Sequence, residues 1–117
     1  MVEKFKYGFG GLKYFLLKDK SVQIQFIIAI IVIAVSLILK INNTELFIIL
    51  MLCGNVIALE MINSAIEMIS DIIDSNHNTK IKQIKDCAAG FVLIMSIITL
   101  IIGLWILVPY ILEIFLN

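Results

Sequence analysis

Residues 58–71 read ALEMINSAIEMISD and place three acidic side chains in a segment that otherwise has the composition of a membrane helix. On an α-helix the polar residues of this segment share one face, because their spacing follows the helical repeat. This polar stripe consists of Glu60, Asn63, Ser64, Glu67 and Asp71. An ionised side chain at the bilayer centre costs about 2.5–3.5 kcal/mol, so such residues face a protein interior or a watery cavity and usually do chemistry or transport there. The stripe therefore predicts a functional site in a membrane protein, although a polar seam that only holds helices together has the same spacing.

The composition of the whole chain indicates an integral membrane protein of one domain. Of the 117 residues, 62% are hydrophobic, and the mean hydropathy of +1.09 lies far above the range of soluble proteins. Three apolar segments are long enough to cross a bilayer, which takes about 20 helical residues. Cys53 and Cys87 fall at different depths of these segments, so no disulfide is expected. The predicted spans are residues 22–41, 45–73 and 88–108.

The segments outside the spans have different characters. Residues 1–20 combine lysines with aromatic and apolar side chains, which predicts an amphipathic helix lying in the membrane interface. A turn at 40–45 and a polar connection over 74–86 join the spans, and Thr44 is suited to cap the second one. His77 is interpreted as a solvated residue of that connection rather than a metal ligand. Pro109 is expected to break or kink the third span.

The distribution of the nine lysines predicts the orientation in the cell membrane. Five lysines precede the first span, three lie between the second and third, one is in the 40–45 turn and none follows the third. Because lysine-rich segments stay in the cytoplasm, the amino terminus and the 74–86 connection of this multi-pass protein are expected there. The polar stripe and Lys85 then lie on the side where ATP and Mg²⁺ are available. A group of carboxylates with one lysine suits a Mg²⁺–nucleotide complex.

Two motifs carry a resemblance to a known family. Residues 60–71 fit the pattern ExxNSAIExxxD, and residues 85–90 fit KDxAAG. Together with Tyr7, Gly11 and an acid at position 19, they resemble the small prokaryotic lipid kinases, the diacylglycerol kinase and undecaprenol kinase family. The resemblance implies an all-α membrane protein with an interfacial amphipathic helix and three transmembrane helices. It also implies a domain-swapped homotrimer with composite sites between subunits.

The resemblance also implies roles for individual residues. Glu60 would be the general base on the lipid hydroxyl, and Asn63 would position the reacting groups. Both would contact the lipid together with Ser64. Asp19 and Glu67 would hold Mg²⁺ on the phosphates of ATP. The implied ATP-binding residues are Tyr7, Asp19, Glu67, Asp71, Lys85 and Asp86.

The chain departs from the family pattern near the first span. Asp19 stands where the family usually has glutamate, and Ser21 and Gln25 replace the asparagine and histidine of the undecaprenol branch. Residues 80–90, KIKQIKDCAAG, look more like that branch. We therefore favour undecaprenol as the lipid alcohol, with diacylglycerol, which would give phosphatidic acid, as the alternative.

A second class of function also fits a glutamate embedded in a membrane span. A small proton-coupled transporter or a pore-forming oligomer could use such a residue as its coupling site. The odd number of spans and the Lys85–Asp86 pair at the cytoplasmic mouth count against this class, since a carrier has no obvious need for a phosphate-binding rim. The expected partners are ATP, a membrane lipid alcohol and further copies of the chain, and no nucleic acid.

Overall fold

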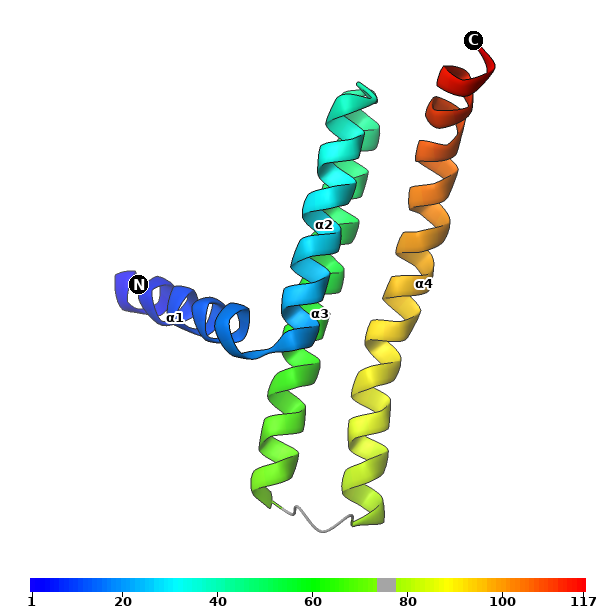
Figure 1. Cartoon of the computed structure of the whole chain (residues 1–117). Helices are drawn as coiled ribbons and strands as arrows, with labels where there is room; N and C mark the ends of the chain where they lie inside the picture. The colour runs from blue at the N-terminus through cyan, green and yellow to red at the C-terminus, as the bar shows by residue number, and fades with distance from the viewer. Residues whose placement is uncertain (74–77) are drawn as a thin grey trace.

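The computed structural model describes residues 1–73 and 78–117, and these residues form four α-helices joined by short connections (Figure 1). No strand occurs in these two ranges. The predicted all-α fold is therefore confirmed, whereas His77 lies outside the described residues. The helices are α1 (Val2–Lys18), α2 (Lys20–Ile38), α3 (Asn43–Ile73) and α4 (Thr79–Leu116).

Three of the four helices are long and apolar enough to cross a membrane, namely α2, α3 and α4. They run alongside one another, and α3 packs against both α2 and α4 (Figure 1). Helix α1 projects away from this bundle, contacts mainly α2 and buries none of its residues. The chain is thus a helical membrane protein in which α3, the helix that carries the polar stripe, is the central packing element.

The bounds of α4 differ from the predicted third span at both ends. Asn78 caps the helix by accepting a hydrogen bond from the backbone N–H of Lys80 (2.9 Å). The prediction that the polar connection extends to residue 86 is therefore wrong, because residues 79–86 are helical. The helix also continues through Pro109 to Leu116, so of the two expected effects, a break or a kink, the break does not occur. Membrane helices tolerate proline where neighbouring groups satisfy the backbone atoms that it frees.

The turn between α2 and α3 is tied to the far end of α4. Asn42, rather than Thr44, accepts a hydrogen bond from the backbone N–H of Glu45 (2.9 Å). The hydroxyl of Tyr110 on α4 donates to the carboxylate of Glu45 and accepts from the backbone N–H of Asn42 (3.4 Å). Lys40 has a positive φ of 55°, which reverses the chain direction within this turn. A small apolar core beneath the turn consists of Ile41, Ile49 and Ile106.

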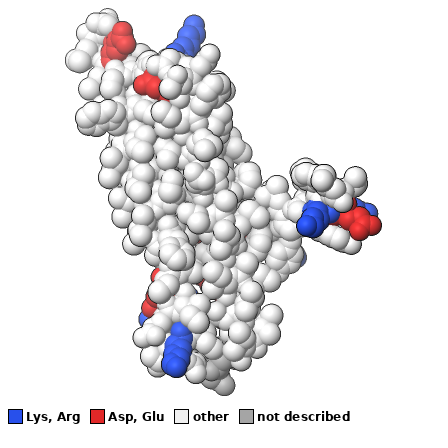
Figure 2. Space-filling model, turned by 180° about the vertical axis from the view of Figure 1, so that it is seen from behind, with Lys and Arg blue, Asp and Glu red and all other residues white. Residues whose placement is uncertain are grey.

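Charged side chains gather at the two ends of the bundle and on α1, with a broad uncharged band between them (Figure 2). Large apolar side chains of this band point outward, including Phe91 at 59% and Trp105 at 82% exposure. A soluble monomer rarely exposes so much contiguous apolar surface. Such a surface suits a protein that lies in a membrane. Cys53 and Cys87 are both free thiols.

Candidate active site

The polar stripe of α3 is buried at its membrane end and exposed at its other end. Only 8% of the surface of Glu60 is accessible to solvent, and the values for Asn63 and Ser64 are 7% and 5%. Glu67 and Asp71, one and two turns further on, are exposed. Because the three buried residues face the bundle rather than lipid, the predicted stripe is placed as expected. Along the stripe, solvent exposure thus increases from the buried carboxyl group of Glu60 to the exposed carboxylates of Glu67 and Asp71.

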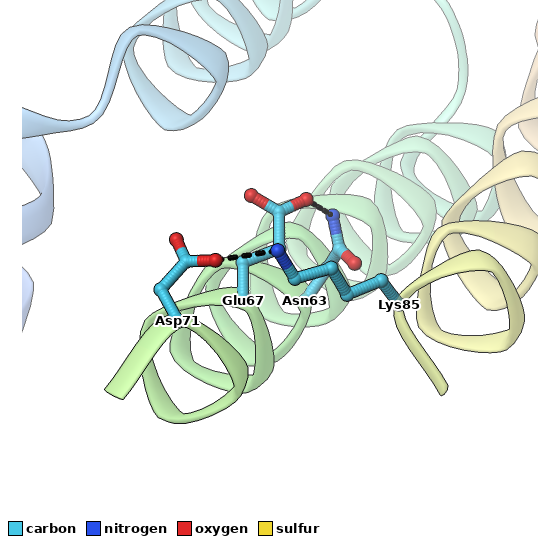
Figure 3. Close-up of polar contacts among 4 residues, drawn as sticks. All are labelled: Asn63, Glu67, Asp71 and Lys85. Carbon is cyan, nitrogen blue, oxygen red and sulfur yellow. Dashed lines mark hydrogen bonds and ion pairs between the residues drawn. The ribbon is translucent and has the colours of Figure 1, made fainter. Parts of the chain in front are cut away.

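Asn63 and Glu67 interact along the stripe. The Asn63 side-chain amide donates a hydrogen bond to Oε1 of Glu67 (3.3 Å; Figure 3). Its own Oδ1 is buried without a partner among the described residues. Leaving a buried acceptor unpaired costs about 1–3 kcal/mol, so folded proteins rarely do it without a functional reason. The Oδ1 atom of Asn63 is therefore available to accept a hydrogen bond from a group other than the described residues.

Lys85 brings α4 to the exposed end of the stripe. Its Nζ lies 2.5 Å from Oδ1 of Asp71 on α3 and points across the gap between the two helices (Figure 3). On α4 itself, Nζ of Lys82 lies 2.7 Å from Oδ2 of Asp86, one helical turn further on. Exposed or partly exposed ion pairs of this kind contribute little to stability. Both lysines can therefore turn to an incoming polyanion at low cost.

Asp19 lies at the junction of α1 and α2, close to the buried end of the stripe. Its Oδ1 accepts a hydrogen bond from the backbone N–H of Val22 (3.1 Å), so the side chain caps α2. The charges of Asp19 and Glu67 both act on the carboxyl group of Glu60. These three carboxylates thus share one neighbourhood, although no hydrogen bond joins them to one another among the described residues.

The structure does not bring all the other predicted site residues together. Tyr7 is 74% exposed on α1, which points away from the stripe. Asp86 is paired with Lys82 on its own helix. In residues 1–73 and 78–117, no three His, Cys, Asp or Glu side chains are arranged to hold a metal ion. The assignment of Asp19 and Glu67 as metal ligands therefore stays a prediction.

Two polar residues near the stripe were missed from the sequence. Lys82 could have been found from its four-residue spacing to Asp86, which places the two on one helical face. Gln23 donates a hydrogen bond from its side chain to the backbone carbonyl of Leu16 (2.9 Å). This contact has no sequence signal, because it depends on how α1 is turned relative to α2.

An apolar groove lies between α2, α3 and α4. Its volume is about 370 Å³, and its walls are mostly aliphatic side chains of the three helices. The polar groups along it are few and come mainly from Gln25, Ser96 and Thr99. The Thr99 hydroxyl is buried without a hydrogen-bond partner among the described residues. The groove begins near Gln25, less than two helical turns from Asp19.

Comparison with known proteins identifies similar sequences along nearly the whole chain. A family model described as prokaryotic diacylglycerol kinase matches residues 6–107. The chain is 34% identical over 91 residues to the undecaprenol kinase of Bacillus subtilis strain 168, covering 78% of this chain and 74% of that protein. It is 26% identical over 114 residues to a diacylglycerol kinase of Synechocystis, covering 97% of this chain and 65% of that protein. All predicted site residues, from Tyr7 to Asp86, lie within the family match.

Proposed function

Since the chain belongs to the prokaryotic diacylglycerol kinase family and is a lipid kinase, we propose that it transfers the γ-phosphoryl group of ATP to the hydroxyl of undecaprenol. The observation that carries the proposal is the graded stripe on α3. It joins the buried carboxyl group of Glu60 to the exposed Asp71–Lys85 pair. A lipid hydroxyl can reach the first from the membrane, and a nucleotide can reach the second from water.

Glu60 is the proposed general base. Its carboxylate takes the proton of the lipid hydroxyl while that oxygen bonds to the γ-phosphorus and the bond from the γ-phosphorus to the ADP oxygen breaks. Asn63 and Ser64, buried beside it, hold the hydroxyl in line. The orphaned Oδ1 of Asn63 supports this role, because a substrate group that donates a hydrogen bond would satisfy it.

The nucleotide is proposed to lie at the exposed end of the stripe. Lys85, released from Asp71, neutralises charge on the phosphates, and Lys82 lies one turn away on the same helix. Asp71 and Asp86 are left to accept hydrogen bonds from the nucleoside. Since phosphoryl transfer depends mainly on positioning and charge neutralisation, these groups supply much of what the reaction requires of the protein.

The donor set in this region fits Mg²⁺. Magnesium prefers oxygen ligands and commonly takes only one or two protein carboxylates, with phosphate oxygens and water completing its shell. Asp19 and Glu67 would hold it, each having a carboxylate oxygen that is not engaged in the hydrogen bonds described above. When bound, Mg²⁺ supplies neutralisation of the phosphate charge.

The proposed assembly is a homotrimer whose sites are completed by a neighbouring subunit. Two features support it. Tyr7 lies far from the stripe of its own subunit because α1 points away, and the bundle leaves many apolar side chains uncovered. The proposed orientation, with the amino terminus and site in the cytoplasm of a cell-membrane protein, is supported by the lysine distribution.

The lipid is tested by direct competition. The higher identity to the undecaprenol kinase supports undecaprenol, whereas the family description and the second relative favour diacylglycerol. Purified protein in mixed micelles receives ATP and both lipids at equal mole fraction, and the two products are quantified. We expect undecaprenyl phosphate to predominate. A kcat/KM ratio about tenfold or more in favour of diacylglycerol would reverse the assignment. Glu60→Gln serves as the control for phosphate release that does not depend on the site.

The transporter and pore interpretations are set aside. The family is one of kinases, and the stripe ends in a lysine–carboxylate group rather than in a continuous polar path across the bundle.

A further inference from the structure

Helices α1 and α2 meet at an elbow that consists of a single non-helical residue. Asp19 has an extended backbone (φ −104°, ψ 114°) and separates Lys18, the last residue of α1, from Lys20, the first of α2. Its backbone N–H donates to the carbonyl of Phe15 (2.9 Å), which completes the last turn of α1. The elbow leaves the chain little conformational freedom, because one residue connects two helices that point in different directions (Figure 1).

Side chains on both sides of the elbow cap the helix ends. The carboxylate of Asp19 accepts from the backbone N–H of Val22 (3.1 Å) at the start of α2. The side-chain amide of Gln23 donates to the carbonyl of Leu16 (2.9 Å) at the end of α1. Helix ends leave such groups without intrahelical partners. Each side chain therefore satisfies one of them, and the Gln23 bond links the first turn of α2 directly to the last turn of α1.

The elbow is anchored to the bundle. Val22 is completely buried, with 0% exposure, and Gln23 beside it is half-buried. The burial of Val22 therefore holds the start of α2 in place. The hydrogen bond from Gln23 to Leu16 holds the end of α1 against the start of α2. It therefore also restrains the backbone of Asp19, which lies between the two helices.

The carboxylate of an aspartate at position 19 depends on this backbone geometry more than the carboxylate of a glutamate would. One of the carboxylate oxygens of Asp19 accepts the hydrogen bond that caps α2, and the other accepts none from the described residues. Aspartate has one side-chain methylene fewer than glutamate and cannot correct a displaced backbone by extending. Asp19 lies close enough to Glu60 for its charge to act on that carboxyl group.

We propose that Gln23 is a positioning residue for the kinase reaction: by holding Leu16, it fixes the backbone of Asp19 and so the position of the Asp19 carboxylate beside the stripe. The inference rests on the proposed function, in which Asp19 contacts the Mg²⁺–ATP complex. Gln23 itself touches neither substrate.

The test compares two substitutions at position 23. Gln23→Met keeps the length of the side chain and removes the donor, whereas Gln23→Lys keeps a donor of similar reach. Gln83→Met makes the same chemical change on an exposed part of α4 and serves as the control. We expect Gln23→Met to raise the Mg²⁺ concentration for half-maximal activity about two- to tenfold, the effect of one lost hydrogen bond. The KM for the lipid should not change, and Gln23→Lys should restore most of the Mg²⁺ response.

A second readout reports the elbow without turnover. Spin labels are placed at Phe9 on α1 and Ile84 on α4, both exposed, in a chain whose native cysteines are replaced. Labelled subunits are diluted with unlabelled ones, so that the distance measured lies within one chain. Gln23→Met should broaden this distance distribution, and Gln23→Lys should narrow it again. An unchanged distribution together with an unchanged Mg²⁺ response would overturn the proposal.

The design separates failure of this inference from failure of the proposed function. Asp19→Asn keeps the capping oxygen but removes the charge. If Asp19→Asn weakens the Mg²⁺ response and Gln23→Met does not, Asp19 is a ligand and Gln23 does not position it. If Asp19→Asn leaves the Mg²⁺ response unchanged, the assignment of Asp19 fails and the positioning role of Gln23 fails with it.

Discussion

At the scale of single residues, the most informative feature is that the acid deepest in the stripe is also the most protected. Glu60 is 8% exposed, whereas the side chain of Asp71 is 62% exposed. A general base needs contact with its substrate and shielding from water, and a phosphate-binding region needs access from water. The two ends of the stripe meet these two requirements on one helix.

Glu60→Gln provides the first prediction. The amide keeps the size and most of the packing of the side chain but cannot accept the proton of the lipid hydroxyl. We expect kcat to fall by roughly 10²–10⁴-fold, with nucleotide affinity nearly unchanged, in a steady-state assay with nucleotide binding measured separately. Near-normal turnover of this variant would remove Glu60 from the mechanism.

The structure changes what is expected of Asp19. From the family pattern alone, Asp19→Glu restores the commoner residue and should be tolerated or improve activity. Asp19 also caps α2, however, and glutamate is a poor N-cap, so this substitution is expected to cost about 0.5–2 kcal/mol of stability. Asp19→Asn should have the opposite profile, with stability preserved and the Mg²⁺ requirement raised. Thermal inactivation and Mg²⁺ titration of the two variants distinguish the two effects, and identical profiles would contradict the dual role.

Periodicity predicted the stripe because all its members lie on one helix. It could not predict the contacts between helices. The Lys85–Asp71 pair depends on the register between α3 and α4, and the Gln23–Leu16 bond depends on the angle between α1 and α2. Local propensity also outweighed polarity at residues 79–86, which are polar yet helical because Asn78 caps them. The distance of Tyr7 from the stripe depends on the direction of α1, which no pattern along the sequence encodes.

At the scale of whole elements, the bundle is closed at one end by hydrogen bonds and opens at the other towards the charged groups. The Tyr110–Glu45 contact joins α4 to the turn between α2 and α3. The small apolar core around Ile49 lies beneath it. At the opposite end, the ion pair between Lys85 and Asp71 joins α4 to α3. The site therefore lies at the more adaptable end of a bundle that is held at the other.

Tyr110→Phe tests this division of roles. The substitution removes the hydroxyl that contacts Glu45 and Asn42 and keeps the ring. We expect the temperature of half-inactivation to fall by a few degrees, with kcat and both KM values unchanged, because the contact lies far from the stripe. Combining it with Glu45→Gln should add little, since both remove the same interaction. A marked loss of kcat at low temperature would show that the closed end affects catalysis.

At the scale of the whole molecule, one subunit holds most but not all of the proposed site. Glu60, Glu67 and Lys85 belong to one bundle, whereas Tyr7 is carried away on α1. An assembly in which each α1 serves the next subunit would complete every site by symmetry.

Subunit mixing tests the composite site. If Glu60 and Tyr7 of each site come from different subunits, a one-to-one mixture of Glu60→Gln and Tyr7→Ala chains should recover activity in about a quarter of the sites. A mixture of Glu60→Gln with Lys85→Ala should recover none, because one subunit supplies both residues. Equal recovery in both mixtures would contradict the arrangement, and absence of recovery in both would place Tyr7 within its own subunit's site.

The length of α4 has a consequence for how the enzyme responds to salt. Its 38 residues extend about 57 Å at 1.5 Å per residue, whereas the hydrocarbon core is about 30 Å thick. Several turns, including the one that carries Lys82 and Lys85, therefore stand clear of the membrane in electrolyte, where charges more than about 8–10 Å apart are largely screened. Glu60 lies in a protein interior, beyond the reach of that screening. Ionic strength should therefore act selectively, raising the KM for ATP while leaving the lipid's KM and the rate of phosphoryl transfer at saturating ATP nearly constant.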